Sequence, residues 1–190
     1  MTFGKSKGPA GEYWDTFCNF LSYPGGGCLH GCKYCWSIRM MGMHGARWEP
    51  NRCPRLIDWP DKIPARVAAY TAKQGSPREV VLCNTSDCYA AGLSPEIREV
   101  RRKTIKIFDE LNIPVCILSK SALAVEDLDL LAGVQCRVGM TVTTLDGAEL
   151  RYWEPYASVP ELRLEVLEKA HDRGIRTWIC LLYTSDAADE

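Results

Sequence analysis

The chain has 190 residues, of which 46% are hydrophobic and 25% charged, and its formal net charge is -1. These values are ordinary for one globular domain that is large enough to bury a core. No apolar run is long enough to cross a bilayer, and a net charge so close to zero gives no overall field that would attract nucleic acid. The composition therefore excludes a membrane-spanning helix and offers no argument for a nucleic-acid-binding protein.

Ten cysteines are present, and the first residues lack the apolar segment of a secretory signal. Without export, so many cysteines indicate a reducing compartment and metal or redox use rather than disulfides. We therefore expect a cytoplasmic protein.

Short β-branched runs alternate with longer helical patterns along the chain. In chain order we expect a strand at 16–21, a cysteine loop at 28–35, a strand at 79–84, a helix at 95–111, a strand at 114–118, a short helix at 122–131, a strand at 135–142, a helix at 160–173 and a strand starting at 175–179. Ser94 is a natural N-cap for the 95–111 helix, with Pro95 as its first residue, and Gly174 closes the 160–173 helix. This alternation predicts right-handed βαβ units and a parallel sheet, which is an α/β fold.

Polar residues follow several of the expected strands. In parallel α/β folds ligands bind at the carboxyl ends of the strands, so we expect these residues to share one rim. They are Thr85, Ser86, Asp87, Ser119, Lys120, Thr141 and Thr143, and the cysteine loop follows the first strand. The convergence of four segments on one rim predicts a single active site.

Three cysteines, Cys28, Cys32 and Cys35, are close enough in sequence to hold one metal cluster from a single loop. An iron–sulfur cube has four irons that each need an outer ligand, so three thiolates leave one iron open to another molecule. An open iron favours catalysis over a purely structural role.

A structural zinc site is the alternative from a different class, a non-catalytic metal-binding module. Such a site is closed by four ligands. Cys18 or Cys53 could supply the fourth, whereas His30 is placed too tightly inside the trio to complete a tetrahedron. Metal analysis separates the two interpretations, which both stay open on the residues alone.

The last residues need a separate interpretation. Residues 180–190 resemble a translated sequencing-adapter read-through, so we expect the native sequence to end near Ile179, with 1–179 as the core domain. An ordinary strand followed by a small acidic tail is the alternative.

The spacing Cys28-x3-Cys32-x2-Cys35, with Tyr34 before the last cysteine, resembles the signature of radical S-adenosylmethionine (SAM) enzymes. The resemblance implies a [4Fe-4S] cluster whose open iron chelates SAM, and an electron donor of the flavodoxin or ferredoxin type. Reductive cleavage of SAM would give methionine and a 5′-deoxyadenosyl radical that abstracts a hydrogen atom from the substrate. The implied fold is a partial parallel (βα) barrel of the radical SAM type, with about five of six βα units present.

Further segments resemble the spore photoproduct lyase-like branch of that superfamily. They are residues 84–87, 118–121, 127–131, 139–144 and 154–157. Carried over by position, Ser86, Lys120 and Thr141 would contact the methionyl and ribose groups of SAM. Asp87 would support the turn that presents Ser86.

Two other residues are assigned to the SAM pocket by the resemblance. Tyr34 would lie against the adenine, where a planar ring is useful. The Arg151-x-x-Glu154-Pro pattern recurs in the branch, so Glu154 would help to shape the pocket, although Arg151 and Glu154 could form only a local ion pair.

One position departs from the branch. The photoproduct lyases carry a hydrogen-donating cysteine directly before the Thr-Ser-Asp turn, and this chain has Asn84 there. The neighbouring Cys83 is expected in the helix layer, because adjacent side chains of a strand point to opposite faces. Nucleic-acid lesion repair is therefore the less favoured enzyme class, and the substrate is left open.

Two further features have structural explanations. Cys88, after the turn, could be a hydrogen donor or a ligand, but a buried thiol is the simpler interpretation. We expect the charges of the 95–111 helix to form a solvated outer face. They are Arg98, Arg101, Arg102, Lys103 and Lys106.

Overall fold

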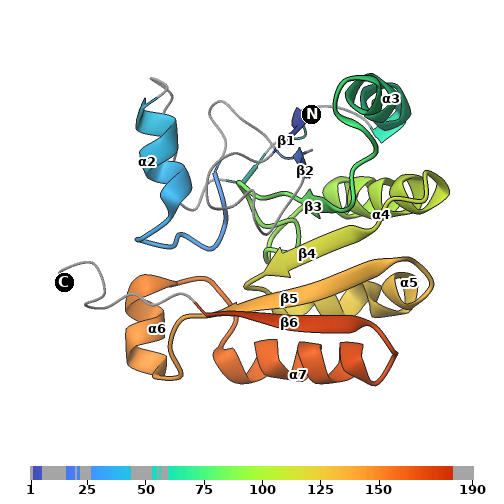
Figure 1. Ribbon diagram of the computed structural model, residues 1–190. Coiled ribbons are helices and arrows are strands. Elements are labelled where there is room, and N and C mark those ends of the chain that lie inside the picture. The colour runs from blue at the N-terminus through green and yellow to red at the C-terminus, as the bar shows by residue number, and fades with distance from the viewer. Residues whose placement is uncertain are drawn as a thin grey trace, which may run out of the picture.

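The computed structural model describes residues 2–5, 16–19, 21, 27–43, 53–54, 56 and 60–181. Its strands form one sheet in the order β1-β2-β3-β4-β5-β6 (Figure 1). The strands are β1 (Thr2–Lys5), β2 (Thr16–Asn19), β3 (Val80–Leu82), β4 (Val115–Ser119), β5 (Cys136–Val142) and β6 (Arg176–Leu181).

The sheet is parallel from β2 to β6, and β1 is antiparallel to β2. The predicted α/β class is confirmed, and so is the partial barrel: five parallel strands form one sheet that stays open within the described ranges. The antiparallel β1 was not predicted. Each predicted strand is present with shifts of a few residues at its ends, which is the usual uncertainty of a boundary.

Helices connect the strands. They are α2 (Trp36–Met43), α3 (Ile63–Gln74), α4 (Pro95–Glu110), α5 (Leu128–Ala132), α6 (Gly147–Trp153) and α7 (Pro160–His171), with 3₁₀ helices η1 (Pro60–Lys62) and η2 (Ala122–Asp127). The predicted helix at 122–131 is therefore a 3₁₀ segment followed by α5. As expected, the Ser94 side chain caps α4 by accepting a hydrogen bond from the Ile97 N–H.

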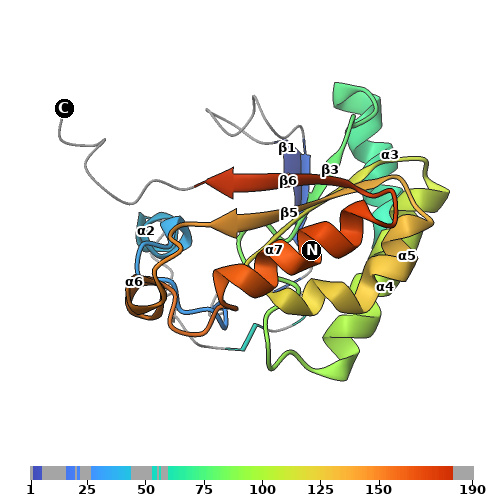
Figure 2. The same cartoon turned by 90° about the horizontal axis from the view of Figure 1, so that it is seen from below.

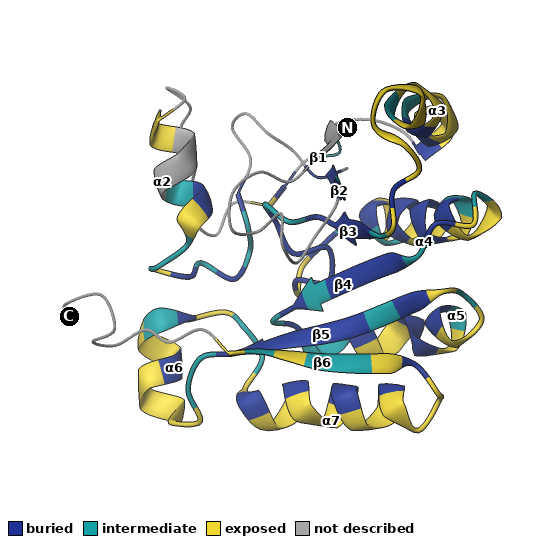
Figure 3. Ribbon diagram, viewed as in Figure 1, coloured by how far each residue is buried: buried dark blue, intermediate teal, exposed yellow. Residues whose placement is uncertain are grey.

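Five of the described α-helices fall into two groups, and α3 packs against α4 and β1. Helices α4, α5 and α7 cover one face of the sheet (Figure 1). Their sheet-facing positions and the strands are coloured as buried in Figure 3, and the buried hydrophobic residues of these elements belong to one cluster, the hydrophobic layer. Helices α2 and α6 instead lie beyond the carboxyl ends of the strands (Figures 1 and 2). No helix in the described part of the chain combines the length and apolarity needed to cross a membrane.

Cys83 lies in the helix layer, as predicted, but for a different reason. Leu82 already packs in the hydrophobic layer, so regular alternation would turn Cys83 to the opposite face. The strand ends at Leu82, and Cys83 has a left-handed backbone with φ 55°. This turn returns the Cys83 side chain to the layer, where Cys88 is also buried.

The expectation of a fully solvated α4 face is wrong for one residue. Arg101 is 1% exposed and donates to Asp127 Oδ2 at 2.7 Å and to the Cys88 carbonyl at 2.8 Å. Its guanidinium also lies 4.0 Å from the ring centroid of Tyr89. A buried cation therefore holds the segment that follows β3 from the helix side.

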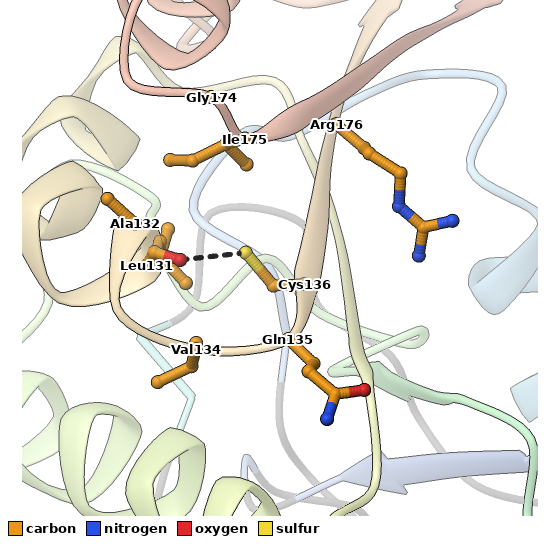
Figure 4. A pocket seen from close by; sticks show the side chains of 8 residues that line it. All are labelled: Leu131, Ala132, Val134, Gln135, Cys136, Gly174, Ile175 and Arg176. Atoms are coloured by element: carbon orange, nitrogen blue, oxygen red, sulfur yellow. Dashed lines mark hydrogen bonds between the residues drawn. The ribbon is translucent and has the colours of Figure 1, made fainter.

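A cavity of about 220 Å³ lies at the amino-terminal ends of β5 and β6 (Figure 4). It is lined by residues from the end of α5 and the starts of both strands, and the Cys136 thiol there donates to the Leu131 carbonyl. This is the opposite end of the strands from α2 and α6 (Figures 1 and 2). The cavity is thus remote from the predicted rim.

Gly139 should tolerate no side chain. It pairs with Trp178 across β5 and β6, and a Cβ at Gly139 would lie 2.2 Å from Trp178 Cε2. We expect Gly139→Ala to lower the free energy of unfolding by about 1–3 kcal/mol through overpacking, measured by urea denaturation.

Gly147→Ala is the matched control for this substitution. A Cβ at Gly147 meets no atom within 4 Å at the start of α6. The control should leave stability unchanged or raise it slightly. Equal denaturation midpoints for Gly139→Ala and the wild type would contradict the close packing of Gly139 on Trp178.

Candidate active site at the cysteine loop

The three cysteines lie on a loop of consecutive turns that leads into α2. The Gly31 N–H donates to the Cys28 carbonyl at 3.4 Å, and the Cys35 N–H donates to the Cys32 carbonyl at 3.3 Å. Cys32 is buried, and Cys28 and Cys35 are partly exposed. The loop therefore presents all three sulfurs within two adjoining turns.

The surroundings of the loop disfavour free thiolates. Burial raises the pKa of Cys28 to about 12, and the Asp87 charge adds to this shift, whereas the N–H groups of His30 and Asp87 oppose it. Burial likewise raises the pKa of Cys32 to about 11, opposed by the Lys120 charge. A positively charged metal centre reverses this preference, because it stabilises the thiolate form.

Three thiols on one loop are the donor set that an iron–sulfur cluster with one open iron would use. In the described part of the chain, no three His, Cys, Asp or Glu side chains are arranged to hold a single metal ion. Of the possible fourth zinc ligands, Cys18 packs in the hydrophobic layer and Cys53 is exposed.

Asp87 connects the cysteine loop to two strand ends. Its carboxylate accepts from His30 Nε2 at 2.7 Å, from the Ser119 hydroxyl at 2.8 Å, and from the N–H groups of Tyr89 and Lys120 at 2.8 Å each. Burial alone would raise the pKa of Asp87, but the His30 imidazole and the N–H donors hold it well below its usual range. Asp87 is thus a buried carboxylate that stays ionised.

The turn after β3 also contacts the loop directly. The Ser86 hydroxyl donates to the Gly27 carbonyl at 3.0 Å, and the Ser37 hydroxyl donates to the Thr85 carbonyl at 3.2 Å. Asn84 has a buried Oδ1 atom without a hydrogen-bond partner in the described ranges. The turn is therefore fixed against both ends of the cysteine loop.

Glu154 forms a second connection to the loop. Its carboxylate accepts hydrogen bonds from the Tyr34 hydroxyl, from the Thr143 hydroxyl at 3.2 Å and from the Arg163 guanidinium. Burial, followed by the Glu154 contact, raises the pKa of Tyr34 above its usual range. The predicted local pair of Arg151 and Glu154 is wrong, because Arg151 is exposed and the buried partner is Arg163.

The remaining predicted residues lie on the same rim. Lys120 Nζ is 5.7 Å from the ring centroid of Tyr34, and its backbone N–H belongs to the Asp87 network. Thr141 is buried near the end of β5, where its hydroxyl lies beside the Cys180 thiol and its carbonyl accepts from Arg163 at 2.7 Å. The structure thus brings every predicted site residue to one edge of the sheet.

Sequence reasoning missed two residues of this site. His30 was considered only as a metal ligand, although its place between two cysteines marked it as part of the loop. Arg163 sits in the amphipathic α7, where its charge resembles a surface residue, and it is fully buried. Only the fold places its guanidinium beside Glu154.

The model of the radical SAM superfamily matches residues 22–185. Among curated proteins, the uncharacterized protein ORF301 of Acidianus two-tailed virus is 26% identical over 163 residues, which is 80% of this chain and 52% of the viral protein.

Solved structures of spore photoproduct lyase are similar in fold. A double variant with bound AdoMet and dinucleoside spore photoproduct gives a TM-score of 0.70 at 17% identity, covering 94% of this chain and 47% of the lyase. A cysteine-to-serine variant also gives 0.70 at 17% identity, covering 98% and 50%. The chain thus spans about half the length of the relatives it matches.

The buried ion pair of Glu154 and Arg163 yields a stability prediction. Both side chains are 0% exposed, so removing the cation leaves a buried carboxylate without its charge partner. We expect Arg163→Met to lower the free energy of unfolding by about 3–5 kcal/mol in urea denaturation.

The double variant Arg163→Met with Glu154→Leu is the control, because it removes both charges. It should recover part of the loss, since a buried pair can be replaced by apolar groups at little cost. A double variant less stable than Arg163→Met would contradict this view of the pair.

Proposed function

Because the chain belongs to the radical SAM superfamily, we propose that it is a radical SAM enzyme. In this proposal Cys28, Cys32 and Cys35 hold a [4Fe-4S] cluster, and SAM binds at the open iron. The bound cluster supplies the electron for reductive SAM cleavage, and the resulting 5′-deoxyadenosyl radical abstracts a hydrogen atom from a substrate that is left open.

One observation supports this proposal above the others. The loop that carries the three cysteines is attached to the carboxyl edge of the sheet by two segments: Ser86 and Asp87 in the turn after β3, and Glu154 after α6. In parallel α/β folds this edge is where ligands bind. The thiols and the residues expected to bind SAM thus belong to one connected site.

The chain's own residues have separate roles in the proposal. Ser86 and Thr141 offer hydroxyl groups to the methionyl and ribose parts of SAM, and the Tyr34 ring offers a surface for adenine. Lys120 brings a positive charge beside Tyr34, which suits a carboxylate. Burial of Cys32 limits access of water to one side of the proposed cluster.

The partners and the location belong to the same proposal. A one-electron donor of the flavodoxin or ferredoxin type would reduce the cluster in the cytoplasm. Lesion repair in nucleic acid is less favoured, because the Asn84 amide does not readily transfer a hydrogen atom, unlike the thiol that the photoproduct lyases carry there. The net charge of -1 adds no general attraction to DNA.

Metal content tests the proposal. After anaerobic reconstitution with iron and sulfide, the wild-type chain should hold about four irons with matching sulfide. Cys32→Ala should hold much less of both, because one of only three protein ligands is lost. Iron, sulfide and zinc are measured by elemental and colorimetric analysis on the same samples.

Cys53→Ala is the matched control. The Cys53 side chain is exposed and makes only a local contact with the Pro54 carbonyl. This variant should keep the wild-type iron content. One zinc per chain without iron and sulfide, lost in both variants, would support the structural zinc module instead.

A further inference from the structure

His30 is a buried polar residue between two of the three cysteines. It is 2% exposed, and each of its two ring nitrogens lies near a protein oxygen. Nε2 lies 2.7 Å from Asp87 Oδ2, and Nδ1 lies 3.5 Å from the Tyr156 carbonyl oxygen. Since both ring nitrogens face protein oxygens, His30 is not arranged as a metal ligand.

The hydrogen bond to Asp87 continues into the opposite wall of the site. The same Oδ2 atom that faces His30 accepts the Lys120 N–H at 2.8 Å, and the other carboxylate oxygen accepts the Tyr89 N–H at 2.8 Å. Asp87 also follows Ser86 directly. His30 is therefore one side chain away from two residues proposed to contact SAM.

The main chain of His30 strengthens the same connection. Its N–H points at the Cys28 sulfur, and its carbonyl accepts the Tyr156 N–H at 3.3 Å. His30 thus contacts the Cys28 sulfur through its backbone N–H and the Asp87 carboxylate through its imidazole. A shift of the loop at Cys28 and a shift of the Asp87 carboxylate cannot be independent.

We propose that His30 is a positioning residue that sets SAM affinity. It does so by fixing the position of Asp87 relative to the cysteine loop, and through Asp87 the positions of Ser86 and Lys120. This inference rests on the proposed function. The physical basis is the N–H that His30 donates to the buried Asp87 carboxylate. Without it, Asp87 Oδ2 keeps the Ser119 hydroxyl and the Lys120 N–H as donors but loses its hydrogen bond to the cysteine loop. The carboxylate and the Lys120 backbone can then shift relative to that loop.

The size of the effect follows from similar networks. Removing a hydrogen-bond partner from the outer shell of a metal site typically costs about 10- to 100-fold in affinity or activity. We therefore expect His30→Leu to weaken SAM binding at least about tenfold per iron-loaded chain. His30→Gln keeps an N–H donor on a side chain of comparable reach and should restore most of the affinity.

The test compares the wild-type chain of 190 residues, His30→Leu, His30→Gln and the control His171→Leu, which changes an exposed histidine at the end of α7. SAM affinity is measured by equilibrium dialysis on reconstituted protein and normalised to iron content. The change that SAM produces in the electron paramagnetic resonance spectrum of the reduced protein is recorded for each sample. We expect this change to be lost in His30→Leu and kept in His30→Gln and His171→Leu.

A second measurement needs no cofactor. Amide hydrogen exchange on the cofactor-free chain reports on the N–H groups of Tyr89 and Lys120, which both donate hydrogen bonds to the Asp87 carboxylate. His30→Leu should speed exchange at both amides, although neither is near residue 30 in sequence. His171→Leu should leave both unchanged.

The outcomes separate this inference from the proposed function. Unchanged SAM affinity and unchanged amide exchange in His30→Leu would overturn the role of His30, and so would equal losses of affinity in the Leu and Gln variants. A wild-type chain that takes up no iron and sulfide would overturn the proposed function. In that case the amide exchange alone decides whether His30 holds Asp87.

Discussion

A buried carboxylate at the carboxyl edge of the sheet is the constraint on which the site depends. Asp87 is only 8% exposed, and a carboxylate with so little access to water needs protein donors in place of its hydration. These donors come from the cysteine loop, from its own turn and from the end of β4. Since hydrogen bonds to a buried charge are short and directional, the three segments are held in one arrangement.

Glu154 is a second buried carboxylate that contacts the cysteine loop, through the Tyr34 hydroxyl, and its charge is paired with the buried Arg163 guanidinium. Two buried carboxylates therefore flank the loop. Burial is the main cause of the raised pKa values of Cys28 and Cys32, the Asp87 charge adds to both, and the Glu154 charge adds to that of Cys32. A metal bound by these cysteines would have to displace the thiol protons, so metal binding and thiol deprotonation would be coupled.

Local patterns were enough to predict the framework but not the long-range contacts. Strand β5 and helix α4 follow from β-branched runs and from the cap at Ser94 and Pro95, which are properties of neighbouring residues. The helices α2, α3 and α6 and the antiparallel β1 were missed. Arg101 and Arg163 were missed as buried cations because burial of a charge depends on a partner far along the chain. The left-handed Cys83 has no local signal at all, since its residue type rarely adopts that backbone.

The turn after β3 makes hydrogen bonds both to the helix layer and to the rim of the sheet, and these contacts determine which of its residues can be substituted without moving the turn. Arg101 donates to the Cys88 carbonyl from the helix layer, while His30 and Lys120 bond Asp87 from the rim. Asn84 takes no part in either set of contacts, and its Oδ1 has no partner within the described residues. A substitution at residue 84 should therefore leave these contacts of the turn in place, including those of the residues proposed to bind SAM.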